Sequence, residues 1–80
     1  MTIDIVAVKT KSDFQLDLEF ANGERRQFDM KPLLKVQPWN RIASIRLFEQ
    51  VRIEYGTVTW AGGEIDIAPD TLYDESVPIR

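Results

Sequence analysis

The sequence contains neither cysteine nor histidine. Without them it lacks the best nucleophile at neutral pH, the commonest general base and the commonest metal ligand. Most enzyme classes depend on one of these side chains, so we expect a protein that is not an enzyme, with no catalytic residue, no metal site and no cofactor. Small domains usually need a disulfide, a metal or a partner subunit, and the first two supports are missing here. The composition therefore favours association with a second copy or another protein.

Long apolar runs are also absent. No run approaches the roughly 18 residues that a membrane-spanning helix needs, and the N-terminal residues Met1 to Asp4 lack the basic start and apolar stretch of a signal peptide. We therefore expect a cytoplasmic protein. Eighty residues suffice for one domain, residues 1–80, near the lower size limit for a single core. An apolar fraction of 44% and two tryptophans indicate that this domain is folded.

Charge is unevenly distributed, although the net charge is only −3. Residues 1–52 contain nine Lys/Arg and seven Asp/Glu, whereas residues 53–80 contain one and six. The acidic side chains of the second part match no calcium loop and are interpreted as caps and solvated surface: Glu64, Asp66, Asp70, Asp74 and Glu75. The basic side chains of the first part suggest an interaction surface, for which the candidates are Arg25, Arg26, Trp39 and Arg41. Because no aromatic residues alternate with them for base stacking, direct nucleic-acid binding is not favoured.

The dipeptide Asn22-Gly23 predicts a β-hairpin, because it separates residues 14–20 from residues 26–30, two runs in which apolar and polar side chains alternate. A two-residue loop would pair Leu18 with Gln27 and so mix the two faces of the sheet. A three-residue loop of residues 21–23 instead pairs Leu16 with Phe28, with Gly23 as a left-handed bulge. We expect the three-residue loop. The buried face then consists of Phe14, Leu16, Leu18, Phe20, Phe28 and Met30. Residues 3–10 are expected to form a preceding strand, and residues 11–13 the turn that follows it.

Short helices are expected between the hairpins. Pro32 is typical of the start of a helical turn through residues 33–34. Asn40 and Ser44 are residue types that cap helices, so residues 39–50 are predicted to form two short helices capped by them. Trp39, Ile42 and Phe48 of these helices are expected to cover the sheet.

A second hairpin is predicted over residues 51–60. A two-residue loop Gly56-Thr57 would pair Tyr55 with Val58 and keep the apolar side chains on one face. A short strand at residues 65–67 and a final helical turn capped by Asp70 follow. The predicted fold class is α+β. It comprises a mainly antiparallel sheet of two hairpins with about five to six strands, short helices between residues 31 and 50, and a short C-terminal helical turn.

An ordered set of residues carries a family resemblance over nearly the whole chain. The set includes Asn22, Gly23, Pro32, Trp60, Asp66, Pro69, Asp70 and Tyr73. In this order they resemble the domain of unknown function 2442 family of small bacterial proteins. The chain departs from the family's pattern in having Ser44 where an Asp is usual, and in a shorter loop between Tyr55 and Val58.

The resemblance implies a compact α+β domain, sometimes fused to a helix-turn-helix domain and often encoded beside another small protein, in the manner of toxin–antitoxin pairs. It implies no catalytic residues. Because Arg80 is the last residue given, we expect no fused helix-turn-helix, and we expect any link to DNA to run through a partner. We predict a non-enzymatic protein-interaction module, an accessory or antitoxin-like component that binds through a strand edge or the helical face near Trp39. The alternative is a small-ligand or nucleic-acid binding module that uses the basic residues of the first hairpin and the helical segment.

Overall fold

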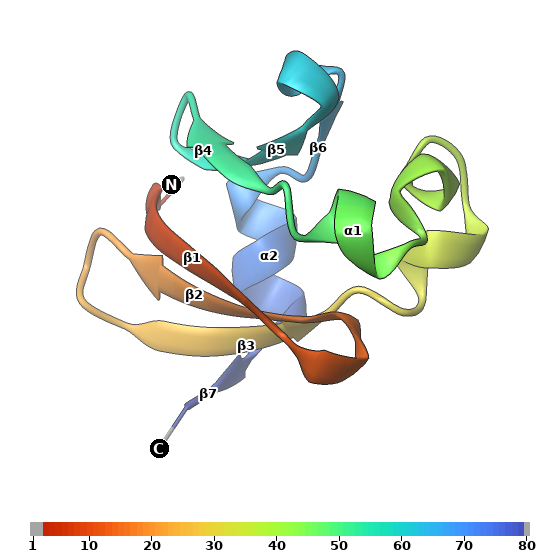
Figure 1. Ribbon diagram of the computed structural model, residues 1–80. Coiled ribbons are helices and arrows are strands. Elements are labelled where there is room, and N and C mark those ends of the chain that lie inside the picture. The colour runs from red at the N-terminus through yellow and green to blue at the C-terminus, as the bar shows by residue number, and fades with distance from the viewer. Residues whose placement is uncertain (1–2, 80) are drawn as a thin grey trace.

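The computed structural model describes residues 3–79, which form seven strands in two antiparallel sheets (Figure 1). One sheet has the order β1-β2-β3-β7, with β1 at Ile5–Lys11, β2 at Gln15–Phe20, β3 at Arg25–Asp29 and β7 at Val77–Pro78. The other has the order β4-β5-β6, with β4 at Arg52–Glu54, β5 at Thr57–Trp60 and β6 at Ile65–Asp66. The α-helices are α1 at Ile45–Phe48 and α2 at Pro69–Glu75. The predicted α+β class is confirmed.

The first hairpin has the predicted three-residue loop. Leu16 lies opposite Phe28, and the amide of Phe20 donates to the carbonyl of Glu24 across residues 21–23. Gly23 has a φ of +90°, in the left-handed region where glycine avoids the steric cost of a side chain. The register therefore follows from keeping apolar side chains on one face.

The two sheets are joined at the start of β1. The amide of Ile5 donates to the carbonyl of Gly56 at 2.8 Å, in the turn between β4 and β5. Just after this contact the pairing of β1 with β2 shifts by one residue, between Ile5 and Ala7. The extra residue in this β-bulge is Val6, whose side chain is 54% exposed. At the other end of β1 a 3₁₀ turn, Ser12–Phe14, connects to β2.

The segment between the hairpins contains short helices, as expected. Two 3₁₀ turns, Leu33–Lys35 and Trp39–Ile42, precede α1. The predicted cap at Ser44 is confirmed, because its hydroxyl accepts from the amide of Leu47 at 3.3 Å. The predicted cap at Asn40 is wrong. Asn40 lies inside the second 3₁₀ turn, which begins after Pro38 and has no side-chain cap.

The predicted loop of the second hairpin is also wrong. Ile53 lies opposite Val58 and Glu54 opposite Thr57, so the loop is Tyr55-Gly56 rather than Gly56-Thr57. Both loop residues have positive φ, 54° and 78°, as in a type I′ turn, whose twist matches that of the flanking strands. Tyr55 is therefore fully exposed at the tip of the turn instead of pairing with Val58.

The C-terminal region contains the predicted strand and helix. A 3₁₀ turn, Ala61–Gly63, leads to β6, and α2 follows. The predicted cap at Asp70 is wrong, because α2 begins at Pro69 and Ala68 occupies the capping position. Asp70 instead lies in the first turn, where a negative charge favours the helix dipole. The last strand, β7, was not predicted; it pairs with β3 and completes the first sheet.

The core lies where the two sheets and the helices meet. Five of the six side chains expected on the buried face of the first hairpin are buried, and Phe14 is half-buried. Phe14 and Trp60 both pack against Phe48, with ring centroids 5.2 and 6.2 Å from its own. Ile42 and Phe48 belong to the core, as predicted, while Trp39 is half-buried against it. Among residues 3–79, no helix has the length and apolar character required to cross a bilayer.

Candidate interaction surface

The acidic residues do not gather into a metal-binding cluster. Within residues 3–79 no group of three or more Asp and Glu side chains is arranged to hold a metal ion. Glu64 instead forms an ion pair with Arg41 at 3.3 Å, and the carbonyl of Asp66 accepts a hydrogen bond from the indole of Trp39 at 3.0 Å. The side chain of Glu64 thus has a basic partner, and the backbone of Asp66 helps to hold Trp39 in place.

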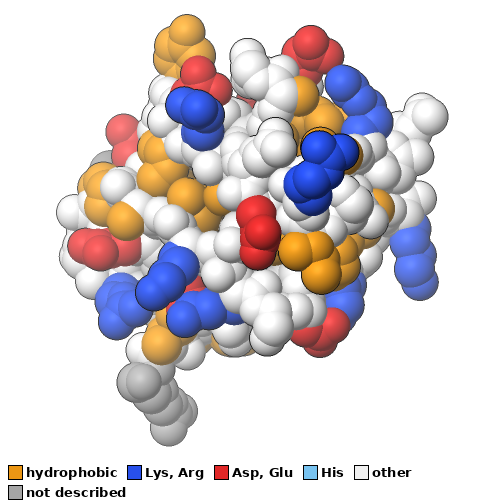
Figure 2. Space-filling model, in the orientation of Figure 1, with side chains coloured by type: hydrophobic (Ala, Val, Ile, Leu, Met, Phe, Trp, Pro, Cys, Tyr) orange, Lys and Arg blue, Asp and Glu red, His pale blue; other side chains and the backbone are white. Residues whose placement is uncertain are grey.

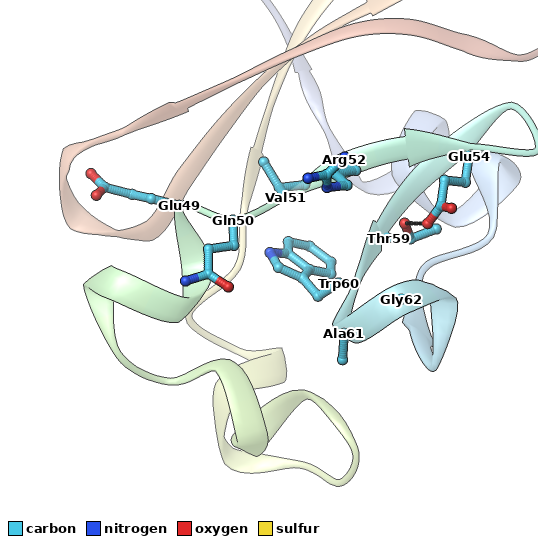
Figure 3. A pocket seen from close by; sticks show the side chains of 9 residues that line it. All are labelled: Glu49, Gln50, Val51, Arg52, Glu54, Thr59, Trp60, Ala61 and Gly62. Atoms are coloured by element: carbon cyan, nitrogen blue, oxygen red, sulfur yellow. Dashed lines mark hydrogen bonds between the residues drawn. The ribbon is translucent and has the colours of Figure 1, made fainter.

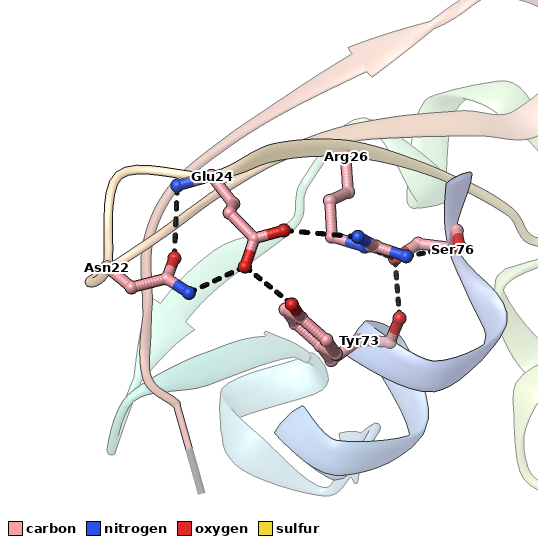
Figure 4. Close-up of polar contacts among 5 residues, drawn as sticks. All are labelled: Asn22, Glu24, Arg26, Tyr73 and Ser76. Carbon is pink, nitrogen blue, oxygen red and sulfur yellow. Dashed lines mark hydrogen bonds and ion pairs between the residues drawn. The ribbon is translucent and has the colours of Figure 1, made fainter. Parts of the chain in front are cut away.

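Arg26 is held inside a polar network between β3 and α2 (Figure 4). Its guanidinium donates to the hydroxyl of Ser76 at 2.7 Å and to the carbonyl of the same residue at 2.9 Å. It also pairs with Glu24 at 3.2 Å and lies over the ring of Tyr73, 4.4 Å from the centroid. Only 13% of this side chain is exposed. The arginine therefore joins the first hairpin to the C-terminal segment and is not free to meet a partner.

Glu24 connects the same network to the hairpin loop. Its carboxylate accepts from the Tyr73 hydroxyl and from the side-chain amide of Asn22. The hydrogen bond from Tyr73 is the largest cause that lowers the pKa of Glu24, followed by the one from Asn22. The same bond to Glu24 raises the pKa of Tyr73, because it is lost when the hydroxyl ionises. Two residues of the family pattern, Asn22 and Tyr73, thus have a structural role.

The four predicted interaction residues do not form one surface. Arg25 is exposed at the start of β3, while Trp39 and Arg41 lie in the 3₁₀ turn Trp39–Ile42 at the other end of the view in Figure 1. Figure 2 shows basic and acidic side chains mixed over most of the face that it presents, with several basic side chains next to one another at its lower left. The structure therefore separates Arg25 and Arg26 from Trp39 and Arg41.

The pocket in Figure 3 lies between the end of α1 and the second sheet, with Arg52 and Glu49 at its rim. The polar groups of Thr59, Glu54 and Trp60 in this pocket already have partners. Thr59 donates to Glu54 at 2.7 Å, and the indole of Trp60 donates to the carbonyl of Phe48 at 2.9 Å. Among residues 3–79, no buried side-chain nitrogen or oxygen lacks a hydrogen bond. The pocket thus offers no buried polar group that a ligand would have to satisfy.

The strand edge expected from the sequence, which named no particular strand, has a candidate in the outer edge of β1. Within residues 3–79, the backbone of Val6 to Thr10 has hydrogen-bond partners only in β2. Ala7, Lys9 and Lys11 are exposed on this strand. The four consecutive apolar residues from Ile5 to Val8 break the alternation where the structure has the bulge at Val6, but they do not show that the strand lies at an edge.

The comparison with protein families gives one match. A model described as "Protein of unknown function (DUF2442)" matches residues 5–78. The chain belongs to the DUF2442 family. The match begins at the first residue of β1 and ends at the last residue of β7, so the DUF2442 domain includes both sheets. Neither a curated protein nor a solved structure matches the chain.

Proposed function

We propose that this DUF2442 protein is a non-enzymatic protein-interaction module that binds an extended strand of a partner along the outer edge of β1. The partner we expect is another small protein encoded nearby, as in a two-gene accessory or antitoxin-like system. We expect both proteins to act in the cytoplasm.

The observation that supports this proposal is the length of the edge. Of the four edge strands in the two sheets, β4 has three residues, and β6 and β7 have two each. The fourth, β1, has seven, and among the described residues only its first residue is hydrogen-bonded to the second sheet. A long row of unpaired amides and carbonyls is a template for a strand from another chain, and proteins usually shorten or cover such edges.

Exposed apolar side chains lie at one end of the same edge. Val6 is 54% exposed and Tyr55 is fully exposed, and Gly56, the neighbour of Tyr55, bonds to Ile5. Aromatic side chains are enriched in the cores of protein interfaces, because they exclude much water at a small entropic cost. The alternative of a nucleic-acid module has less support, because Arg26 and Arg41 already pair with carboxylates.

The test compares two double variants that make the same chemical change at different places. The edge variant is Val6→Asp with Lys9→Glu, and the control is Ile45→Asp with Lys35→Glu. Val6 and Ile45 are 54% and 64% exposed, and both lysines are exposed. Tagged chains are expressed in the native host, and proteins retained by the wild type are identified by mass spectrometry. The identified partner is then purified and mixed with each variant.

We expect a stoichiometric complex with the wild type and the control, and a complex weakened at least about tenfold by the edge variant. Hydrogen exchange should slow at residues 6–11 when the partner is bound. The proposal is wrong if the purified partner binds both variants equally well, or if it protects a surface other than β1.

A further inference from the structure

The outward face of β1 has a gap beside its edge. Ala7 lies opposite Glu19 of β2, and Lys9 lies opposite Asp17. A shallow groove runs over these residues and is completed by Arg25. Since the side chain of Ala7 is a single methyl group, the carboxylate of Glu19 can be reached from beyond the edge of the sheet. Glu19 has no ion pair among residues 3–79.

An added strand places its side chains at a defined distance from this carboxylate. Neighbouring strands lie about 5 Å apart, so a residue opposite Ala7 on an added strand is about 10 Å from the backbone of Glu19. The extended side chains of a lysine and a glutamate together span this separation. A lysine at that position of a partner strand would thus complement Glu19 across Ala7.

A second copy of the chain supplies this lysine. In an antiparallel pair with a two-fold axis at Val8, each Val8 lies opposite its counterpart and Ala7 lies opposite Lys9 of the other copy. This register keeps outward-facing residues on the outward face. It places each Lys9 directly opposite an alanine and not opposite the other Lys9, and like charges directly opposite each other would destabilise the pair.

We propose that the chain forms a symmetric dimer through antiparallel pairing of two β1 strands, in which Lys9 of each copy reaches over Ala7 to Glu19 of the other. Such an interface is isologous, so both ion pairs form together. The pairing extends from Val6 to Thr10, because the amide of Ile5 is already bonded to Gly56. Five residues per copy make a small interface, and the dimer is therefore in a concentration-dependent equilibrium with the monomer.

The dimer rests on the same open edge as the proposed function, and a strand from another protein would compete with it. The two ideas fail separately. A chain that stays monomeric contradicts the dimer but leaves the edge available to a different partner, which the matched double variants test.

The experiment is a charge exchange followed by sedimentation equilibrium over a wide range of protein concentration. The variants are Lys9→Glu, Glu19→Lys and the double exchange of both, with Lys35→Glu as the control because Lys35 is exposed in a turn outside the sheet. Circular dichroism verifies that each variant is folded. Lys9→Gln and Glu19→Gln replace any charge reversal that fails this check.

We expect the wild type and the control to dimerise with the same dissociation constant. Each single reversal should raise this constant by about tenfold or more, because two symmetry-related ion pairs become repulsive, and added salt should reduce the difference. The double exchange should restore dimerisation, and β1 amides should exchange more slowly as the wild type is concentrated. A wild type that is monomeric at every concentration would overturn the dimer. So would a dimer insensitive to both reversals, or a double variant that is not restored.

Discussion

Replacing Arg26 with alanine tests whether the polar network holds the C-terminal segment on the first sheet. The change removes the hydrogen bonds to the hydroxyl and carbonyl of Ser76 and the contact with the ring of Tyr73. Hydrogen bonds from a charged group contribute about 1.5–3 kcal/mol each, and a partly buried cation–π contact about 1 kcal/mol. Water that enters the space can hydrogen-bond to the groups left behind and offsets part of this free energy. We therefore expect the free energy of unfolding to fall by about 3 kcal/mol.

That loss is large for a chain of this length, whose total stability is expected to be about 4–12 kcal/mol. It corresponds to a decrease in Tm of about 12–24 °C. The assay is urea unfolding followed by tryptophan fluorescence, with Arg25→Ala as the matched control. Arg25 is the adjacent arginine on the same strand but is exposed, so its loss should cost less than about 0.5 kcal/mol.

Hydrogen exchange adds a local measurement to the same pair of variants. The amide of Ile79 donates to the carbonyl of Arg25 at 2.9 Å, next to β7. This amide should exchange faster in Arg26→Ala and at the wild-type rate in Arg25→Ala, because the second change leaves the backbone in place. Equal stability of the two variants would refute the view that Arg26 fastens the C-terminal segment.

Three further changes test other parts of the fold. Tyr73→Phe should make stability depend less on pH at both extremes. In the wild type, the lowered pKa of Glu24 contributes stability that is present above about pH 4.5 and is lost on acidification. The raised pKa of Tyr73 contributes stability that is present below about pH 10 and is lost above it. Thermal melts from pH 3 to 11 measure both effects. Gly56→Ala should destabilise the fold by about 1–2 kcal/mol or more, because φ is +78° at this residue and the added methyl would lie 2.7 Å from the carboxyl carbon of Asp4. Adding Asp4→Ala to the same chain should recover part of this loss, as measured by urea unfolding. Ser44→Ala should cost about 1 kcal/mol in the same assay, because it removes the cap of α1.

The first hairpin could be predicted from the sequence because, of the two short loops that Asn22-Gly23 allows, only the three-residue loop keeps the apolar side chains on one face. An even loop would have placed polar residues opposite apolar ones, so the alternation excluded it and fixed Leu16 opposite Phe28. In the second hairpin, the alternation did not distinguish between the candidate loops. Moving its loop from Gly56-Thr57 to Tyr55-Gly56 shifts each partner by two residues and returns every side chain to the same face. The pattern alone therefore could not distinguish the two loops, and the observed one requires a tyrosine with positive φ.

The candidate interaction surface could not be predicted because the exposure of its residues depends on contacts distant in sequence. Arg25 and Arg26 are adjacent, yet one is exposed and the other is covered by α2 and Ser76, fifty residues away. The two-residue strand β7 is equally invisible to patterns, because it is too short to alternate and exists only through its pairing with β3. Once β7 covers part of β3, the remaining long edge is β1, and no local signal in residues 5–11 shows that they are left at an edge.

An open edge in a small protein must still exclude indiscriminate pairing. The bulge at Val6 interrupts the hydrogen-bond ladder near one end of β1. Lys9 and Lys11 destabilise, by charge repulsion, the pairing of any strand that places a positive charge opposite them. These features leave the central amides and carbonyls of β1 accessible while they penalise unmatched partners. A strand that offers its own lysine to Glu19 and a small side chain opposite Lys9 avoids the penalty, and β1 of a second copy meets both conditions. We expect an unrelated partner of this edge also to avoid a positive charge opposite Lys9, so its edge strand can be sought by this pattern.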